Sequence, residues 1–354
     1  MAKNEVRIDW KVLQAFTQEV FTALGMPPED AQVEAEVLVW ANLRGVDSHG
    51  VLRIPSYQRA VERGGMNPNP EIRVANETAA TLLIDCDRAF GPVVTVWAME
   101  RVIDKAHQTG IGWAILRETS HQGAMGYYPL LAVAQDMAGI ALVCSPPNTA
   151  PYGARVPGVH NAPIAIGVPA QRHRPLLLDM ATSVAAGGKV MLARDKGIPM
   201  PEGWALDKEG RPTTDPNLVG ALLPTGAYKG SGLAIMFESL SGIMVGNPLL
   251  APVLAGRERP VGQNSILAAI DIGVFTDVDE YKATVDEMID GLKALPPAEG
   301  FDEVLVPGEP EERTYEARKR DGRMYVGCRT AHQGLVEHER ERLRRIREQA
   351  MQKE

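Results

Sequence analysis

The middle of the chain alternates short apolar runs with longer helical stretches, and this alternation limits its fold more than any other feature. The apolar runs are bounded by Gly, Pro or polar residues and lie at 81–85, 111–117, 139–145, 164–168, 176–179 and 266–270. Runs of this length are typical of buried strands. Helical stretches are expected near 92–108, 124–137, 184–195, 232–245 and 279–294. The sequence therefore predicts an α/β domain over about residues 79–299.

Both ends of the chain predict helices instead. The first helix begins after Asp9 and stops near Gly25, the second ends at Gly45, and the third runs from about 47 to 64. The last 45 residues return to helical patterning, and the mixed charges at 337–347 are typical of a solvent-facing helix surface. The simplest architecture is a discontinuous helical domain, 1–78 plus 300–354, into which the α/β domain is inserted.

Composition excludes several classes of protein. The chain has 354 residues with 37 basic and 45 acidic side chains, a net charge of −8, so a nucleic-acid partner is not expected. Cys86, Cys144 and Cys328 lie far apart, and no H-E-x-x-H pattern occurs, so no disulfide framework or metal site is predicted. No signal peptide or apolar run of about 18 residues is evident. We therefore expect a cytoplasmic protein without membrane contact.

The third predicted helix carries polar side chains where a core helix would be apolar. His49, Arg53 and Tyr57 are spaced at i, i+4 and i+8, which places them on one helix face. The guanidinium of Arg53 could hold a substrate carboxylate through two parallel hydrogen bonds, next to the His49 imidazole. The alternatives are a capping or packing role for His49 and a structural ion pair for Arg53.

Three further segments carry candidate binding residues. His121 directly follows the predicted strand at 111–117, and ligands commonly bind at the carboxyl ends of strands in α/β sheets. Asp179 ends another strand, where it could bind a hydroxyl pair, orient a histidine or cap a helix. Lys229 lies among glycines ahead of an apolar helix, which suits contact with a phosphate or carboxylate.

Familiar nucleotide and hydrolase motifs are missing. The pair Gly110 and Gly112 precedes a strand and lacks the third glycine of a dinucleotide fingerprint, and no Walker A loop is present. No G-x-S-x-G elbow surrounds Ser48 or Ser120, so a hydrolase nucleophile is not indicated. If the chain binds a nucleotide, its binding site is built neither from a Rossmann fingerprint nor from a Walker A loop.

Several long motifs in register resemble the type 2 malate/L-lactate dehydrogenase family, which includes ureidoglycolate, sulfolactate and diketogulonate-type enzymes and cyclic-imine reductases. The resemblance covers about residues 9–325. It is carried by RGVDSHGVLRIPSY (44–57), SHQGAMGYY (120–128), LLDMATSVAAGGKV (177–190), EGWALDKEGRPTTDP (202–216), AYKGSGLA (227–234) and PGEPE (307–311). It implies NAD(P)-dependent chemistry on 2-oxo or 2-hydroxy acids, a non-Rossmann NAD(P)-binding mixed-sheet domain, and a homodimer.

The resemblance also implies roles for single residues. His49 of the D-S-H-G motif, together with Ser48, and His121 of the S-H-x-G motif compete for the role of proton carrier. Arg53 becomes the carboxylate-binding residue, with Tyr57 beside it. The residues that resemble the family's cofactor contacts, with NAD or NADP as cofactor, are His121, Ser145, Asp179, Met180, Ala181, Lys229, Gly308 and Glu309.

Two departures from the family pattern bear on the substrate. The chain has Asn161-Ala162-Pro163 where Thr-Asn-Pro is expected, and Gln122 where many relatives have an aromatic residue. We expect interconversion of a small 2-hydroxy acid and its 2-oxo acid, with His as general acid or base. The alternative is reduction of a cyclic imine 2-carboxylate, which Asn161 and Gln122 could favour. An alternative of another class is a non-catalytic carboxylate-binding protein.

Overall fold

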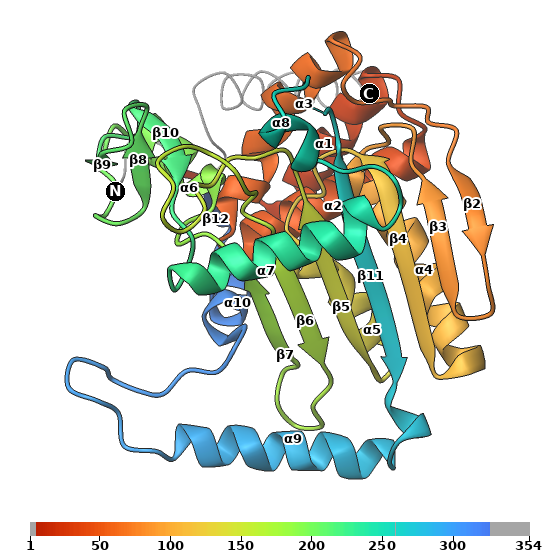
Figure 1. Cartoon of the computed structure of the whole chain (residues 1–354). Helices are drawn as coiled ribbons and strands as arrows, with labels where there is room; N and C mark the ends of the chain where they lie inside the picture. Colours follow the sequence, from red (N-terminus) through yellow and green to blue (C-terminus); the bar gives the residue numbers. More distant parts are fainter. Residues whose placement is uncertain (1–4, 259, 326–354) are drawn as a thin grey trace, which may run out of the picture.

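A seven-stranded mixed sheet forms the centre of the protein (Figure 1). The computed structural model describes residues 5–258 and 260–325. The strands lie in the order β2-β3-β4-β11-β5-β6-β7, and β3 and β4 are parallel while all other neighbours in this sheet are antiparallel. Their bounds are β2 Arg73–Glu77, β3 Thr81–Asp85, β4 Ile111–Thr119, β5 Met137–Cys144, β6 Ile164–Val168, β7 Leu176–Met180 and β11 Gln263–Asp271. The predicted α/β class is confirmed.

Helices cover both faces of the sheet, which explains why its strands are apolar on both sides. Alternate residues of the strands, such as Leu116 and Val143, pack against α4 (Gly91–Thr109) and α5 (Tyr127–Val133). The residues between them, such as Ile115 and Leu142, pack against α7 (Tyr228–Glu238), which crosses the opposite face in Figure 1. A long helix, α9 (Val278–Lys293), follows β11 after a 3₁₀ turn, η4 (Ile272–Val274).

The N-terminal helices pack as a further layer against α4. Their core contains Leu13, Phe21, Leu38 and Phe90. A helix from the C-terminal part of the chain, α10, also packs in this layer. Its Glu312 forms an ion pair at 2.7 Å with Arg44, which directly follows α2. The elements are α1 Trp10–Ala23, α2 Pro28–Leu43, α3 Ile54–Glu62 and α10 Glu309–Asp321, and a short sheet pairs β1 Glu5–Arg7 with β12 Arg323–Tyr325.

The predicted helix over 47–64 is wrong in its first part. Two 3₁₀ turns, η1 (Asp47–His49) and η2 (Val51–Arg53), flank Gly50, whose backbone is extended, and α3 begins only at Ile54. Asn42 fixes this break, since its Oδ1 accepts a hydrogen bond from the Val51 N–H at 2.9 Å. A Cβ at position 50 would lie 2.1 Å from that same oxygen, so the close approach requires glycine.

Two other predicted helices differ in length. The helix expected at 124–137 is the shorter α5, because the chain turns at Asp136 with a φ of 56° and enters β5 directly. The helix expected at 232–245 begins earlier, as α7, and ends in a π-helical turn, η3 (Ser239–Ile243). The predictions at 92–108, 184–195 and 279–294 are confirmed as α4, α6 (Gly187–Lys196) and α9.

A small three-stranded sheet was not expected from the sequence. Its order is β10-β8-β9, with bounds β8 Ala205–Asp207, β9 Pro212–Thr213 and β10 Val219–Leu222. It packs on α6 through a cluster that includes Val190, Ala193 and Leu222. A one-turn helix, α8 (Ala251–Leu254), lies between η3 and β11.

The proposed domain boundaries stay a prediction. Strand β2, from residues assigned to the helical segment, is the edge strand of the central sheet, while α10 packs with the N-terminal helices as the discontinuous arrangement expects. The charged segment at 337–347 lies outside the described residues. Among the described helices, none combines the length and apolar character required to span a bilayer.

Candidate active site

The strand register gathers chain segments that are far apart in sequence at one edge of the sheet. The end of β4 meets the start of β11 (Thr119 opposite Gln263), and the start of β11 also meets the end of β5 (Asn264 opposite Cys144). The start of β6 meets the end of β7, with Ile164 opposite Met180. Residues that follow or precede these strand ends therefore converge, in agreement with the location expected for ligands in α/β sheets.

Two adjoining cavities lie at this edge. The smaller has a volume of about 270 Å³ and the larger about 640 Å³. They share the wall residues His49, Gly123, Asn161, Pro163 and Ala186. Of the other predicted site residues, the smaller cavity is lined by Arg53, His121 and Ser145, and the larger by Ser48, Asp179, Met180, Ala181 and Gly308.

The two candidate histidines lie side by side. Their ring centroids are 5.4 Å apart and the planes differ by 19°. The Nδ1 atom of His121 accepts the Gly123 N–H at 3.2 Å and lies 2.6 Å from the Tyr57 hydroxyl. This favours the neutral tautomer with hydrogen on Nε2. The Nδ1 atom of His49 lies 2.9 Å from the Ser48 hydroxyl. Within the described chain, neither Nε2 atom has a hydrogen-bond partner.

Arg53 has no acidic counterpart among the residues that the structure describes. Its Nε donates to the Ser48 carbonyl at 2.7 Å, and its Nη1 contacts the Met191 sulfur at 3.7 Å. The alternative of a structural ion pair for Arg53 therefore finds no partner in residues 5–258 and 260–325. A half-buried guanidinium that faces a cavity in this way is suited to bind an anionic ligand.

Desolvation by the surrounding protein shifts the pKa values of these groups. Burial lowers the pKa of His49 from its usual 6.5 to about 3, and the charge of Arg53 contributes in the same direction. Burial also holds the pKa of His121 well below its usual value. The charges of Arg53 and His49 lower it further. Burial raises the pKa of the Tyr57 phenol. At neutral pH the site thus contains two uncharged imidazoles and one cation.

Asp179 faces the larger cavity from the end of β7. Its Oδ2 accepts the Gly126 N–H at 2.8 Å, directly ahead of α5. The capping interpretation is wrong, because the N-caps of α5 and α6 are Gly126 and Ala186 and neither helix has a side-chain capping hydrogen bond. The Asp179 side chain is exposed on the wall of this open cavity. Desolvation by the cavity walls raises the pKa of its carboxyl group to about 6, and the hydrogen bond from Gly126 acts in the opposite direction.

Two predicted cofactor residues line neither cavity. Lys229 is exposed in the first turn of α7. Glu309 forms an ion pair with Lys293 at 2.7 Å. Their contact with a cofactor stays a prediction. Gly308, by contrast, has a φ of +86°, and a Cβ there would lie 3.0 Å from the Leu177 carbonyl oxygen, so the chain approaches β7 closely beside the larger cavity.

Sequence patterns gave little indication of several cavity residues. Asn148 and Gln263 line the smaller cavity but lie in loops or at a strand start without a local signal. Lys189 lines the larger cavity from the first turn of α6. The glycines before it were a usable signal, because a Cβ on Gly188 would lie 2.6 Å from the Cβ of Ser48. Only a small residue lets α6 approach η1 so closely.

Gln122 lies between the protein core and the smaller cavity. Its side-chain nitrogen lies 2.6 Å from the Thr95 hydroxyl and 3.0 Å from the Ser265 hydroxyl, between α4 and β11. The side chain is almost fully buried. Its amide nitrogen is thus engaged with the protein core, whereas its Oε1 has no hydrogen-bond partner in the described chain and Gln122 lines the smaller cavity, so its contact with an imine substrate stays a prediction.

Sequence comparison agrees with this geometry. The family model described as malate/L-lactate dehydrogenase matches residues 8–327. The chain belongs to the malate/L-lactate dehydrogenase family. It is 42% identical over 306 residues to L-sulfolactate dehydrogenase of Methanocaldococcus jannaschii, covering 85% of this chain and 88% of that protein. It is 33% identical over 312 residues to ureidoglycolate dehydrogenase (NAD(+)) of Escherichia coli K12, covering 87% and 89%.

Solved structures of family members have the same fold. Sulfolactate dehydrogenase from Methanocaldococcus jannaschii superposes with a TM-score of 0.80 at 37% identity, over 93% of this chain and 95% of that one. Δ1-Piperideine-2-carboxylate reductase from Pseudomonas syringae pv. tomato superposes with a TM-score of 0.79 at 27% identity, over 94% and 99%. This member of the malate/L-lactate dehydrogenase family is thus an oxidoreductase, and the non-catalytic alternative is not favoured.

The low pKa of His49 predicts a pH-dependent stability. Between its folded pKa of about 3 and its usual 6.5, the unfolded chain binds more protons than the native one. The free energy of unfolding should therefore rise with pH across this interval, by about 1.4 kcal/mol per pH unit, and this contribution is lost as the pH falls below 6.5. Urea unfolding at a series of pH values should give a smaller slope for His49→Gln than for the wild type.

The exposed His107, on α4, provides the control for this measurement. His107→Gln should keep the wild-type slope. Equal slopes for His49→Gln and the wild type would show that the His49 imidazole is not held neutral by the fold.

Proposed function

We propose that the chain is a nicotinamide-dependent oxidoreductase that interconverts a small 2-hydroxy acid and the corresponding 2-oxo acid. The observation that carries this proposal is the guanidinium of Arg53, which has no acidic partner in the described chain and shares a cavity with two neutral imidazoles, His49 and His121. A cation to fix a carboxylate and a proton carrier beside it are the two groups that such a reaction requires from the protein.

Arg53 orients the substrate in this proposal. Its Nε is already bound to the Ser48 carbonyl, which fixes the plane of the guanidinium. The remaining nitrogens can donate to the two oxygens of a carboxylate, and such charge-assisted pairs are directional. The carbon next to the carboxylate then lies toward the paired imidazoles.

The hydrogen bonds favour His49 as the proton carrier. His121 accepts at Nδ1 and so keeps its hydrogen on Nε2, where it can donate a hydrogen bond to a substrate oxygen. His49 can donate from Nδ1 to the Ser48 hydroxyl, which leaves its Nε2 able to take the proton of a substrate hydroxyl during oxidation. His121 remains the alternative carrier if the two tautomers are reversed.

Substrate binding and protonation are coupled through Arg53. The Arg53 charge is one cause of the lowered pKa of both histidines. A bound carboxylate would offset that charge and raise both pKa values toward the range in which an imidazolium can form. The neutral imidazole before binding is suited to accept a proton, and the imidazolium formed in the complex is suited to return it to a 2-oxo acid.

The larger cavity fits a dinucleotide cofactor. Asp179 presents a carboxylate that can accept hydrogen bonds from a hydroxyl pair, and Lys189 on the first turn of α6 can bind a phosphate. Met180, Ala181 and Gly308 line the same cavity, and Ser145 lies in the adjoining one. A bound nicotinamide supplies the hydride donor or acceptor. The name of the ureidoglycolate relative specifies NAD(+); NAD and NADP both remain candidates for this chain.

A cyclic imine 2-carboxylate is the second candidate substrate. The superposed reductase from Pseudomonas syringae is named for such a compound. Asn161 lines both cavities, and its Oδ1 accepts a hydrogen bond from Asn148 at 2.9 Å, which leaves its amide hydrogens for a ligand. The same carboxylate contact at Arg53 would serve both substrate classes.

We also propose a homodimer. The outer side of α7 and η3 exposes apolar side chains that a monomer would leave in water, among them Tyr228, Ile235, Met236, Ile243 and Met244. A second copy of the chain, as the family resemblance implies, would cover them. Light scattering at micromolar concentration tests this proposal, and a monomer would contradict it.

A substrate panel distinguishes the two candidate reactions. We expect oxidation of NADH or NADPH, followed by absorbance, with 2-oxo acids such as oxaloacetate, pyruvate and sulfopyruvate. Piperideine-type and pyrroline-type carboxylates serve as the alternative set. Faster turnover of the cyclic imines would replace the first proposal by the second, and the absence of turnover with every compound and both cofactors would count against each of them.

Removal of the Arg53 charge should weaken substrate binding. We expect Arg53→Met to lower kcat/KM by at least about 100-fold, since charge-assisted hydrogen bonds contribute about 1.5–3 kcal/mol each. The kcat/KM of Arg53→Lys should lie between those of the wild type and Arg53→Met, because lysine keeps the charge but lacks the planar pair of donors. Arg59→Met removes an exposed arginine of α3 and should leave kinetics unchanged. Wild-type kcat/KM in Arg53→Met would refute the assigned carboxylate contact.

Removal of the proton carrier should affect turnover more than binding. General acid–base catalysis contributes about 10²–10⁴-fold, so His49→Gln should lower kcat within that range while KM changes little. His121→Gln should show a smaller loss if it only donates a hydrogen bond. A larger loss in His121→Gln than in His49→Gln would reverse the assignment. Near-wild-type kcat in the double variant would eliminate both histidines.

A further inference from the structure

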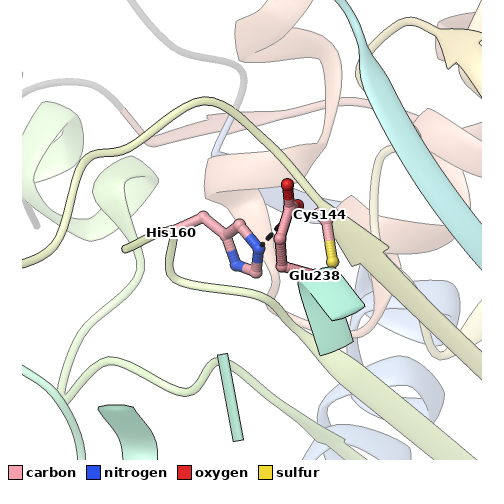
Figure 2. A group of neighbouring side chains, drawn as sticks. All are labelled: Cys144, His160 and Glu238. Carbon is pink, nitrogen blue, oxygen red and sulfur yellow. Dashed lines mark ion pairs between the residues drawn. The ribbon is translucent and has the colours of Figure 1, made fainter. Parts of the chain in front are cut away.

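A second cluster of reactive side chains lies on the α7 side of the central sheet, apart from the two cavities. Cys144 ends β5, His160 lies in the loop before β6, and Glu238 ends α7. Figure 2 shows the three side chains pointing toward one another. Their Sγ, ring nitrogen and carboxylate oxygen atoms all lie within 4.8 Å of one another, and all three residues are buried.

Several polar atoms of this cluster lack hydrogen-bond partners. They are both ring nitrogens of His160 and the Oε2 atom of Glu238. His160 is fully buried and Glu238 is 2% exposed. A buried polar atom without a partner costs about 1–3 kcal/mol. Three such atoms in one place indicate that the protein alone does not complete this site.

The spacing of the unpartnered atoms fits two ligands of one metal ion. The Nε2 atom of His160 and the Oε2 atom of Glu238 are 3.6 Å apart, which is longer than an ordinary hydrogen bond. Two ligands that each lie about 2.1 Å from a tetrahedral ion are about 3.4 Å apart. The observed separation is close to that value.

Glu238 is held in the orientation that a metal ligand requires. Its Oε1 accepts the backbone N–H groups of Leu249 at 2.6 Å and Leu250 at 3.0 Å, which leaves Oε2 directed toward His160. Such outer hydrogen bonds commonly orient ligating carboxylates. The π-helical turn η3 begins directly after Glu238, and interruptions of this type are frequent at functional sites.

We propose that Cys144, His160 and Glu238 bind a divalent metal ion with the preferences of Zn²⁺. A thiolate, an imidazole and a carboxylate are the ligand types that this ion accepts, and a trapped water molecule completes a tetrahedron. The thiol of Cys144 loses its proton to solvent as the metal–sulfur bond forms. The charges of thiolate and carboxylate then balance that of the ion, so the site is neutral in its buried surroundings.

The site stabilises the fold rather than taking part in the reaction. None of its three residues lines either of the two cavities. Each of two ligands precedes a cavity residue, however, since Cys144 is followed by Ser145 and His160 by Asn161. The metal ion therefore fixes two walls of the active site from behind. Ligand spacing in the sequence could not reveal this, because the three residues come from separate elements.

Cobalt substitution tests the proposal on the full-length protein. The protein is stripped with a chelator, dialysed and titrated with Co²⁺ and then Zn²⁺. We expect one equivalent of Co²⁺ to produce intense visible bands typical of tetrahedral coordination and a near-ultraviolet thiolate-to-metal band, both of which Zn²⁺ removes. Zn²⁺ should also raise the Tm of the stripped protein. A wild-type protein that gives no such bands and no rise in Tm would overturn the proposal.

Variants locate the ion. Cys144→Ala and His160→Gln should each lose the bands and weaken Zn²⁺ binding at least tenfold, whereas Cys86→Ala, which alters another buried cysteine, should behave as the wild type. Unchanged binding in Cys144→Ala would show that the ion binds elsewhere. A Tm that neither the chelator nor added Zn²⁺ changes would leave His160 and Glu238 as a structural pair and refute the metal site.

Discussion

The insertion of β11 between β4 and β5 is the constraint on which the active site depends. β11 is contributed by a segment more than 110 residues beyond β5 in sequence, and it pairs antiparallel with both neighbours along its length. This pairing fixes the register of β4 against β5 and so brings the segments after Thr119 and Cys144 to the same sheet edge. His121 and Ser145, which line one cavity, owe their proximity to it.

The fold was predictable where local burial determines it. Strands such as β3 and β6 are apolar on both faces because helices cover both sides of the sheet, and a continuous apolar run reports that directly. The exposed edge strand β2 carries no such run and was missed. The break at Gly50 was missed for another reason, since it depends on a hydrogen bond from Val51 to Asn42 on α2.

The candidate site was partly predictable, although one argument for it was wrong. His49, Arg53 and Tyr57 were expected together on one helix face, but they reach the site through two 3₁₀ turns and the start of α3. They still converge, because Tyr57 contacts His121 and Arg53 lines the same cavity as His49. Contacts between remote segments, such as that of α6 with η1 through Gly188, have no local signal beyond the glycine itself.

The electrostatics of the site depend first on burial and then on the charge of Arg53, for which the described protein provides no acidic partner. If Arg53 were paired with a buried carboxylate, its charge would no longer contribute to the lowered pKa values of the two histidines. In the proposed reaction, the carboxylate of the substrate would supply the negative charge that Arg53 lacks. Its binding would raise the pKa of both imidazoles just before the proton is transferred. In this proposal, one unpaired guanidinium couples substrate binding to proton transfer.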